Sequence, residues 1–175
     1  MTASHPLVGV VLGSASDAPY AQTLSQTLAS FGISHEVTIT SAHRTPDDTV
    51  RYARNASSRG IKVLVCAAGL SAALPGVVAA NTTLPVIGVP VPAGTLGGID
   101  ALLSIAQMPP GVPVGSVGIG GAKNAALLAV RILALQDETL GRKLDEWAEA
   151  ESGRILKARE AVEGMPAAPC EAYRS

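Results

Sequence analysis

The sequence predicts an α/β fold in which one parallel sheet lies between two layers of helices. Short, almost continuously apolar runs alternate with longer amphipathic segments, beginning with the run Leu7–Leu12 that ends in Gly13. Such runs are typical of strands buried on both faces, and strands that alternate with helices form right-handed βαβ units. The predicted architecture is therefore a three-layer α/β/α sandwich with a parallel, flavodoxin-like central sheet.

Five strands are expected in chain order, each an apolar or alternating run: Leu7–Leu12, His35–Thr40, Ile61–Ala67, Val86–Val91 and Val114–Ile119. The helices expected between and after them are Ala18–Phe31, Pro46–Arg59, Val77–Asn81, Ile99–Gln107, Asn124–Leu135 and Glu138–Glu163. Asp17 stands at the N-cap position of the first helix, with Pro19 in its first turn and Gly32 after its end. Gly60 follows the second helix in the same way.

The last two helices differ in character. Asn124–Leu135 is apolar almost all round, as expected of a helix buried between neighbours. Glu138–Glu163 is rich in charge but carries an apolar stripe that we expect to pack on another subunit, made of Leu140, Leu144, Trp147, Ile155 and Leu156. No linker divides the chain, so residues 1–164 are expected to form one domain and residues 165–175 a disordered tail.

The composition bounds the possible partners. Hydrophobic residues make up 47% of the chain but charged residues only 15%, against about 25% in an ordinary soluble domain. So much apolar surface indicates burial between subunits, and hence a homo-oligomer. The net charge of −1 gives no reason to expect nucleic acid or an anionic membrane as a partner. With only two cysteines, Cys66 in a buried run and Cys170, and no signal peptide or membrane span in evidence, the expected location is the cytoplasm.

The segment Thr40–Pro46 is the strongest candidate for chemistry. It follows a predicted strand, and ligands of open α/β sheets bind at the carboxyl ends of the strands. His43 would titrate near neutral pH and serve as a proton shuttle, and the guanidinium of Arg44 would clamp a phosphate or carboxylate. The alternative is a solvated histidine beside a helix that Thr45 caps.

Two further loops follow predicted strands. Gly13–Asp17 offers hydroxyls, amides and a helix N-terminus to a phosphate or ribose, or it only caps the helix. Gly69–Gly76 is small and apolar, and would enclose a flat ligand or only allow close packing. Lys123 is either a binding charge or a solvated lysine at a helix start. No histidine has a partner at metal-ligand spacing, so no metal site is expected.

Taken together, several motifs resemble those of the 5-(carboxyamino)imidazole ribonucleotide mutase (PurE) family of purine biosynthesis. The matching motifs are Gly13-Ser-x-Ser-Asp17, Ser41-Ala-His-Arg-Thr-Pro46, Ala73-Leu-Pro-Gly76, Val86-Ile-Gly-Val-Pro90, Ser104-Ile-x-Gln-Met-Pro109, Gly111-Val-Pro-Val114 and Asn124-Ala-Ala-Leu-Leu-Ala129. They occur in this order and span roughly residues 8–135, and their joint occurrence is far more specific than any one of them.

The resemblance implies an isomerase that moves carboxylate from the exocyclic nitrogen to C4 of the imidazole, through carbon dioxide held beside the ring. His43 would be the general acid and base, and the Val89–Pro92 loop would help to enclose the ring. The substrate-binding residues implied are Ser14, Ser16, Asp17, Ser41, Ala42, Arg44, Gly69, Leu70, Ser71, Ala72, Ala73 and Leu74. The family assembles as octamers, and the resemblance implies no metal and no organic cofactor.

One loop departs from the family pattern. The common mutase motif is Gly-Gly-Ala-Ala-His-Leu-Pro-Gly, whereas this chain has Gly69-Leu-Ser-Ala-Ala-Leu-Pro-Gly76, with Ala73 in place of a second active-site histidine. A sister class that carboxylates aminoimidazole ribonucleotide directly with free carbon dioxide has a Ser-Asn-Ala-Leu-Ser-Gly-like loop. The alternatives to the mutase are therefore this direct carboxylase, a paralogue acting on a related ribonucleotide, or a non-catalytic nucleotide-binding module.

Overall fold

The strands form one parallel sheet that confirms the predicted flavodoxin-like architecture. The computed structural model describes residues 5–166, 168, 169 and 172. The strands are β1 (Val8–Leu12), β2 (His35–Ile39), β3 (Val63–Gly69), β4 (Val86–Val91) and β5 (Gly115–Ser116). Their order in the sheet is β2-β1-β3-β4-β5, and every neighbouring pair is parallel. The sheet thus reverses its winding beside β1, where open α/β sheets bind ligands.

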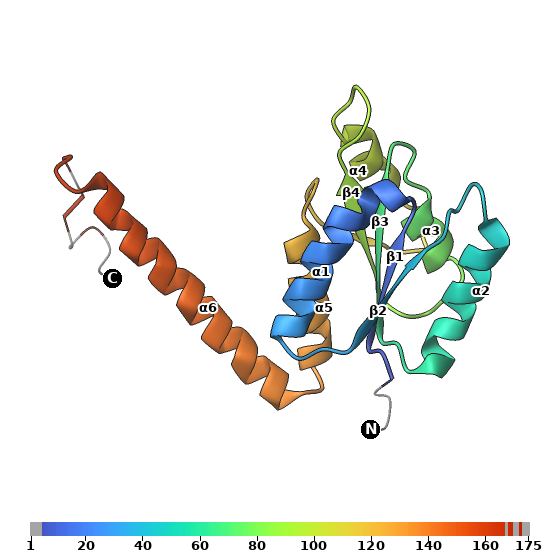
Figure 1. Cartoon of the computed structure of the whole chain (residues 1–175), viewed down its shortest axis with the longest axis horizontal. Coiled ribbons are helices and arrows are strands. Elements are labelled where there is room, and N and C mark those ends of the chain that lie inside the picture. The colour runs from blue at the N-terminus through green and yellow to red at the C-terminus, as the bar shows by residue number, and fades with distance from the viewer. Residues whose placement is uncertain (1–4, 167, 170–171, 173–175) are drawn as a thin grey trace.

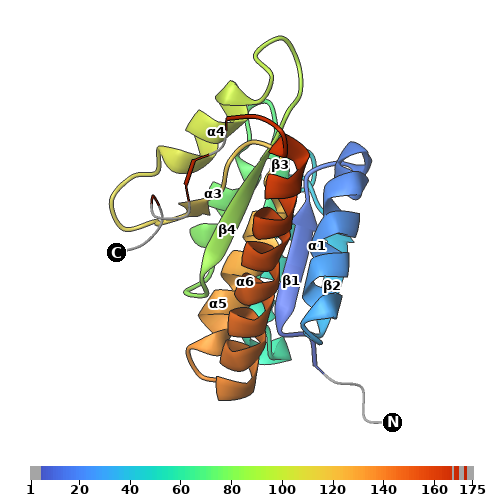
Figure 2. The ribbon, with the colours of Figure 1, turned by 90° about the vertical axis from the view of Figure 1, so that its left-hand side faces the viewer.

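Helices cover both faces of this sheet (Figures 1 and 2). They are α1 (Ala18–Ser30), α2 (Pro46–Ala56), α3 (Leu74–Ala79), α4 (Ile99–Ala106), α5 (Ala122–Ala134) and α6 (Glu138–Ala158). Helices α1 and α5 pack on one face, and α2, α3 and α4 pack on the other. Short 3₁₀ turns, Ala15–Asp17, Ser57–Arg59 and Arg159–Val162, adjoin α1, α2 and α6.

Alternating side chains divide the core into two layers. In β1, Val8, Val10 and Leu12 are buried against the α1 and α5 layer, whereas Val11 is buried against the opposite one. Cys66 of β3 lies in that second layer and is fully buried, as predicted, and its burial raises the pKa of the thiol. Cys170 lies outside the described residues.

Several element boundaries differ from the prediction, among them those of the last strand and of α3. The last strand was expected over Val114–Ile119, but β5 pairs with β4 only at Gly115 and Ser116. Beyond this pair the chain turns, and the Gly120 amide donates to the carbonyl of Pro90. Helix α3 begins at Leu74 rather than Val77, because a proline at the start of a helix gives up an N–H that has no helical partner anyway.

Helix α6 packs on its own chain over its first half. Leu140 is buried in the core layer formed by α1 and α5, so the expectation that it packs on another subunit is wrong. Leu144 and Trp147 are partly buried against the same layer, and their packing on another subunit stays a prediction. Ile155 and Leu156 are 65% and 54% exposed. The helix ends at Ala158 rather than Glu163, and its far part projects away from the sheet (Figure 1).

The predicted division into a domain of residues 1–164 and a disordered tail stays a prediction. Much of that tail, at positions 167, 170, 171 and 173–175, lies outside the described residues. Within the ranges that the structure describes, we find no helix that is both long and apolar enough to span a lipid bilayer.

Candidate active site

A pocket of about 800 Å³ lies at the carboxyl edge of the sheet, where the loops after β1, β2, β3 and β4 meet. The loops after β1 and β2 supply most of its polar side chains, and those after β3 and β4 supply mainly apolar ones. The structure brings every predicted site residue to this pocket: Ser14, Ser16, Asp17, Ser41, Ala42, His43, Arg44, Gly69, Leu70, Ser71, Ala72, Ala73 and Leu74.

The loop after β1 forms a small hydroxyl and carboxylate cluster. The Ser14 hydroxyl caps the 3₁₀ turn by accepting from the Ser16 amide. The Ser16 hydroxyl lies 3.0 Å from Ser14 Oγ and 3.3 Å from Asp17 Oδ1. Asp17 occupies the N-cap position of α1, yet its carboxylate makes no capping hydrogen bond. The alternative that this carboxylate only caps the helix is therefore wrong.

Asp17 is a buried carboxyl group, 4% exposed. Burial raises its pKa, because removal from water disfavours the charged form. Hydrogen bonds from the Ser16 hydroxyl and from the backbone of Ser14 and Gly13 act in the opposite direction but do not outweigh burial. A carboxyl group kept in so unfavourable a place is typical of a functional site.

The loop after β2 is held in shape by threonine hydroxyls. Thr40 Oγ1 lies 2.7 Å from Thr49 Oγ1 of α2, which is fully buried, and 3.2 Å from Thr45 Oγ1. Thr45 occupies the N-cap position of α2, but its hydroxyl accepts from the Ser41 amide and makes no capping hydrogen bond, so the alternative in which Thr45 caps this helix is wrong on that point. These contacts fix both ends of the turn that carries His43.

Arg44 is oriented by two contacts at the base of the pocket. Its Nη2 donates to the carbonyl of Gly13 at 3.2 Å, and its Nε donates to Ser41 Oγ at 3.4 Å. A guanidinium has five N–H donors, so others stay available to an anion. The side chain joins the loops after β1 and β2 and holds a fixed positive charge beside Ser14.

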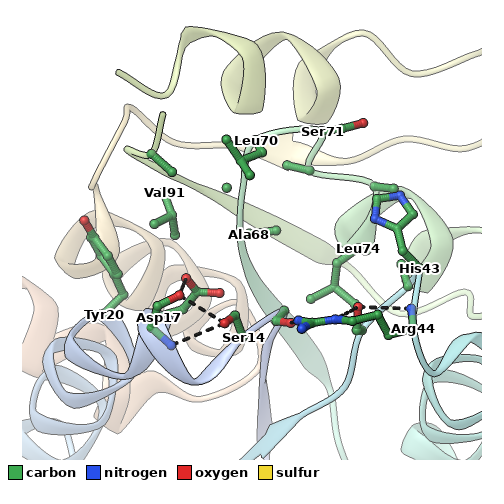
Figure 3. Close-up of a pocket in the computed structure, with 18 of the residues that line it drawn as sticks. Ser14, Asp17, Tyr20, His43, Arg44, Ala68, Leu70, Ser71, Leu74 and Val91 are labelled. Atoms are coloured by element: carbon green, nitrogen blue, oxygen red, sulfur yellow. Dashed lines mark hydrogen bonds between the residues drawn. The ribbon is translucent and has the colours of Figure 1, made fainter. Parts of the chain in front are cut away.

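Figure 3 shows how these groups surround the pocket. Ser14 and Arg44 lie along its base, Asp17 and Tyr20 on one side, and His43 on the other side near Ser71. Such an arrangement suits a ligand with an anionic group at the base and a ring that reaches the imidazole. In the described part of the chain, His, Cys, Asp and Glu side chains nowhere gather in threes as a metal site would require.

The family model described as AIR carboxylase matches residues 7–153. The chain belongs to the AIR carboxylase family. An N5-carboxyaminoimidazole ribonucleotide mutase of Aquifex aeolicus is 54% identical over 140 residues, which cover 80% of this chain and 84% of that protein. One of Saccharolobus solfataricus is 49% identical over 154 residues, 88% of this chain and 98% of that protein.

A crystal structure of Treponema denticola PurE superposes with a TM-score of 0.81 at 31% identity, and covers 90% of this chain and 99% of that one. The resemblance inferred from the motifs is thereby confirmed at the level of family and fold. In this member of the AIR carboxylase family, Ala73 lies at the N-cap of α3 and lines the pocket. Its methyl group occupies the position at which the common motif has a histidine.

Some lining residues of this family member were not predicted, namely Pro19, Tyr20, Ala68 and Ala93. Tyr20 comes three residues after Asp17, a spacing that places both on one face of a helix, so the sequence held a usable signal. Lys123, left open by the sequence, contacts α6 instead of the pocket. Its Nζ lies 3.8 Å from Glu151 Oε1 and 5.5 Å from the centre of the Trp147 ring.

Asp17→Asn is expected to stabilise the fold at neutral and mildly alkaline pH. The raised pKa means that an ionised Asp17 costs folding free energy, whereas its protonated form does not. Its stabilising contribution is complete below the ordinary pKa of 3.8 and is lost as pH rises through the raised value. Thermal unfolding should show a Tm about 2–4 °C above wild type, the shift that about 1 kcal/mol produces.

The two melting curves should converge well below the ordinary pKa of 3.8, where wild-type Asp17 is protonated whether the chain is folded or unfolded. Asp47→Asn, at an exposed position on α2, is the matched control. A Tm difference for Asp17→Asn that is the same at every pH would show that burial of its charge is not the cause.

Proposed function

We propose that this chain is an N5-carboxyaminoimidazole ribonucleotide mutase, which acts in purine biosynthesis. The observation that carries the proposal is one pocket with an anion-binding base, Ser14 and Arg44, and a proton-transfer group, His43, at its side. A ribonucleotide presents the complementary features, a phosphate joined through ribose to a heterocycle. Relatives 49% and 54% identical bear the name of this enzyme.

In the proposed binding mode, the phosphate accepts hydrogen bonds from Arg44 and from the Ser14 loop at the start of the helical segment. Asp17 accepts hydrogen bonds from ribose hydroxyls, and these take the place of the hydrogen bonds from water that its buried carboxylate lacks. Ser16, Ser41 and Ala42 line the ribose phosphate, and residues 69–74 enclose the ring. The imidazole ring then lies on the His43 side of the pocket.

The reaction requires one group that gives and takes a proton. His43, protonated, donates to the exocyclic nitrogen as the nitrogen–carboxylate bond breaks, and the bond's electron pair stays on nitrogen. The carbon dioxide so formed accepts an electron pair from ring carbon C4, and a carbon–carbon bond forms. Neutral His43 then takes the proton from C4. The cycle is an isomerisation, and it returns His43 to its starting form.

A two-substrate assay tests this function. The purified protein receives either the carbamate ribonucleotide or aminoimidazole ribonucleotide with bicarbonate, and formation of the C4-carboxylated product is followed in each case. We expect saturable turnover of the carbamate and little direct carboxylation at low carbon dioxide. Efficient direct carboxylation would instead assign the chain to the carboxylase reaction that Ala73 brings into question, and binding without turnover would make it a nucleotide-binding module.

The proposal extends to a homo-octamer in the cytoplasm. Its support is a set of large apolar side chains at least 46% exposed on different elements: Val37, Ile39, Ile99, Leu103, Leu135, Ile155 and Leu156. Sedimentation equilibrium should give a mass eight times the 17.7 kDa of the chain, and a monomer would contradict this part of the proposal. The free, buried thiol of Cys66 is compatible with a reducing compartment, which cell fractionation would test.

A further inference from the structure

Leu70 has a strained backbone at the rim of the pocket. Its φ of 55° is the only positive φ of a non-glycine residue in the part of the chain that the structure describes. A branched side chain is disfavoured in this left-handed region by contact between Cβ and the backbone. The next turn fixes the conformation, because the Ala72 amide donates to the Leu70 carbonyl at 2.8 Å. Strained residues are concentrated at binding and active sites.

The Leu70 side chain spans the gap between two loops. It follows β3, is 54% exposed, and faces Gly94 of the loop after β4. A Cβ built on Gly94 would lie 3.0 Å from Leu70 Cδ2, so the leucine passes close to the bare backbone there. Figure 3 shows Leu70 on the side of the pocket away from Ser14 and Arg44. It therefore stands where the ring of a nucleotide held by its phosphate would end.

We propose that Leu70 is the apolar cover of the reacting ring, and that it retains carbon dioxide between the two halves of the reaction. This inference rests on the proposed function. Glycine or asparagine would satisfy the left-handed turn at lower cost, so the leucine is explained by what its side chain covers. Carbon dioxide is small and apolar, and an apolar wall closes its exit without holding water beside it.

Loss of the cover has a defined chemical result. The nitrogen–carboxylate bond breaks and His43 protonates the nitrogen, but carbon dioxide leaves before C4 attacks it. Aminoimidazole ribonucleotide is released, and His43 regains its proton from water. The fraction of turnovers that releases aminoimidazole ribonucleotide therefore measures the loss of carbon dioxide. Complete burial of a leucine side chain changes an equilibrium constant by roughly tenfold to a hundredfold. Because Leu70 is half-exposed, its removal is expected to increase the loss of carbon dioxide by about tenfold.

The test compares wild type with Leu70→Asn and Leu70→Gly on carbamate substrate labelled in its carboxylate. Label retained in the C4 product is measured under unlabelled carbon dioxide and corrected for loss without protein. Both variants should release about tenfold more label than wild type. Their Tm should stay within about 3 °C of wild type, because both residues accept the left-handed turn. Leu7→Asn, at an exposed leucine outside the pocket lining, is the matched control.

The outcomes are separable. A wild-type protein that does not convert the carbamate contradicts the proposed function itself. If wild type converts it and either folded variant retains label as well as wild type does, the role of Leu70 is overturned. Two variants are used so that a folding defect in one leaves the other as the deciding measurement.

Discussion

His43→Asn is expected to lower kcat for the carbamate ribonucleotide by about 100-fold to 10,000-fold, the usual contribution of a positioned acid and base. Asparagine keeps hydrogen-bonding groups near the same place but has no site that gains and loses a proton near neutral pH. The loop itself should persist, because Thr40, Thr45 and Thr49 hold it rather than the imidazole. Steady-state kinetics and thermal unfolding measure the two effects separately.

Binding supplies the internal check for this variant. Calorimetric titration with aminoimidazole ribonucleotide should give a Kd within about threefold of wild type, since less than 1 kcal/mol separates such values. His5→Asn is the matched control, because His5 is exposed and is not among the residues that line the pocket. Equal turnover by wild type and His43→Asn would remove the imidazole from the mechanism.

Arg44→Met is expected to weaken ribonucleotide binding by about 10-fold to 100-fold, the range for a lost hydrogen bond to a charged group. Methionine retains much of the length of the side chain but removes the charge and the donors that point to the base of the pocket. The affinity of Arg44→Lys should lie between those of wild type and Arg44→Met, because an ammonium group keeps the charge but cannot make the paired contacts of a guanidinium. KM and Kd should change more than kcat.

A phosphate-free ligand isolates the cause. If Arg44 holds the phosphate, wild type and Arg44→Met should bind the corresponding ribonucleoside with nearly equal Kd. Arg51→Met is the matched control, since Arg51 is an exposed arginine of α2 whose partner is Asp48. A penalty that persists with the ribonucleoside would instead assign Arg44 a role in the shape of the loops, through its contacts with Gly13 and Ser41.

Much of the fold could be predicted because the strands are buried on both faces and therefore appear as uninterrupted apolar runs. Strand β4 has the predicted bounds, Val86–Val91. The errors occur where the local sequence does not decide the structure. Strand β5 is shortened by a turn whose hydrogen bond goes to the distant carbonyl of Pro90. The far end of α6 carries exposed apolar residues, so the apolar pattern does not mark where the helix stops.

The site was predictable for a related reason. Polar residues that follow strands meet at one sheet edge, and this placed Ser14, Asp17, His43 and Arg44 in a common pocket. The sequence did not reveal that Asp17 is buried without capping α1, because that depends on how the loops fold over it. Nor did it show the strain at Leu70, since backbone angles are set by the turn as a whole.

The division of the pocket between successive loops has a consequence for how the site evolves. Under the proposed function, residues 13–44 hold the anion, and residues 69–74 and 91–93, which line another part of the same pocket, enclose the heterocycle. In that arrangement, selection is able to change the residues that enclose the ring while the residues that bind the sugar phosphate stay the same. This chain is an instance, since its departures from the family motif at Leu70, Ser71 and Ala73 occur beside a Ser41-Ala-His-Arg-Thr-Pro46 that matches the family motif.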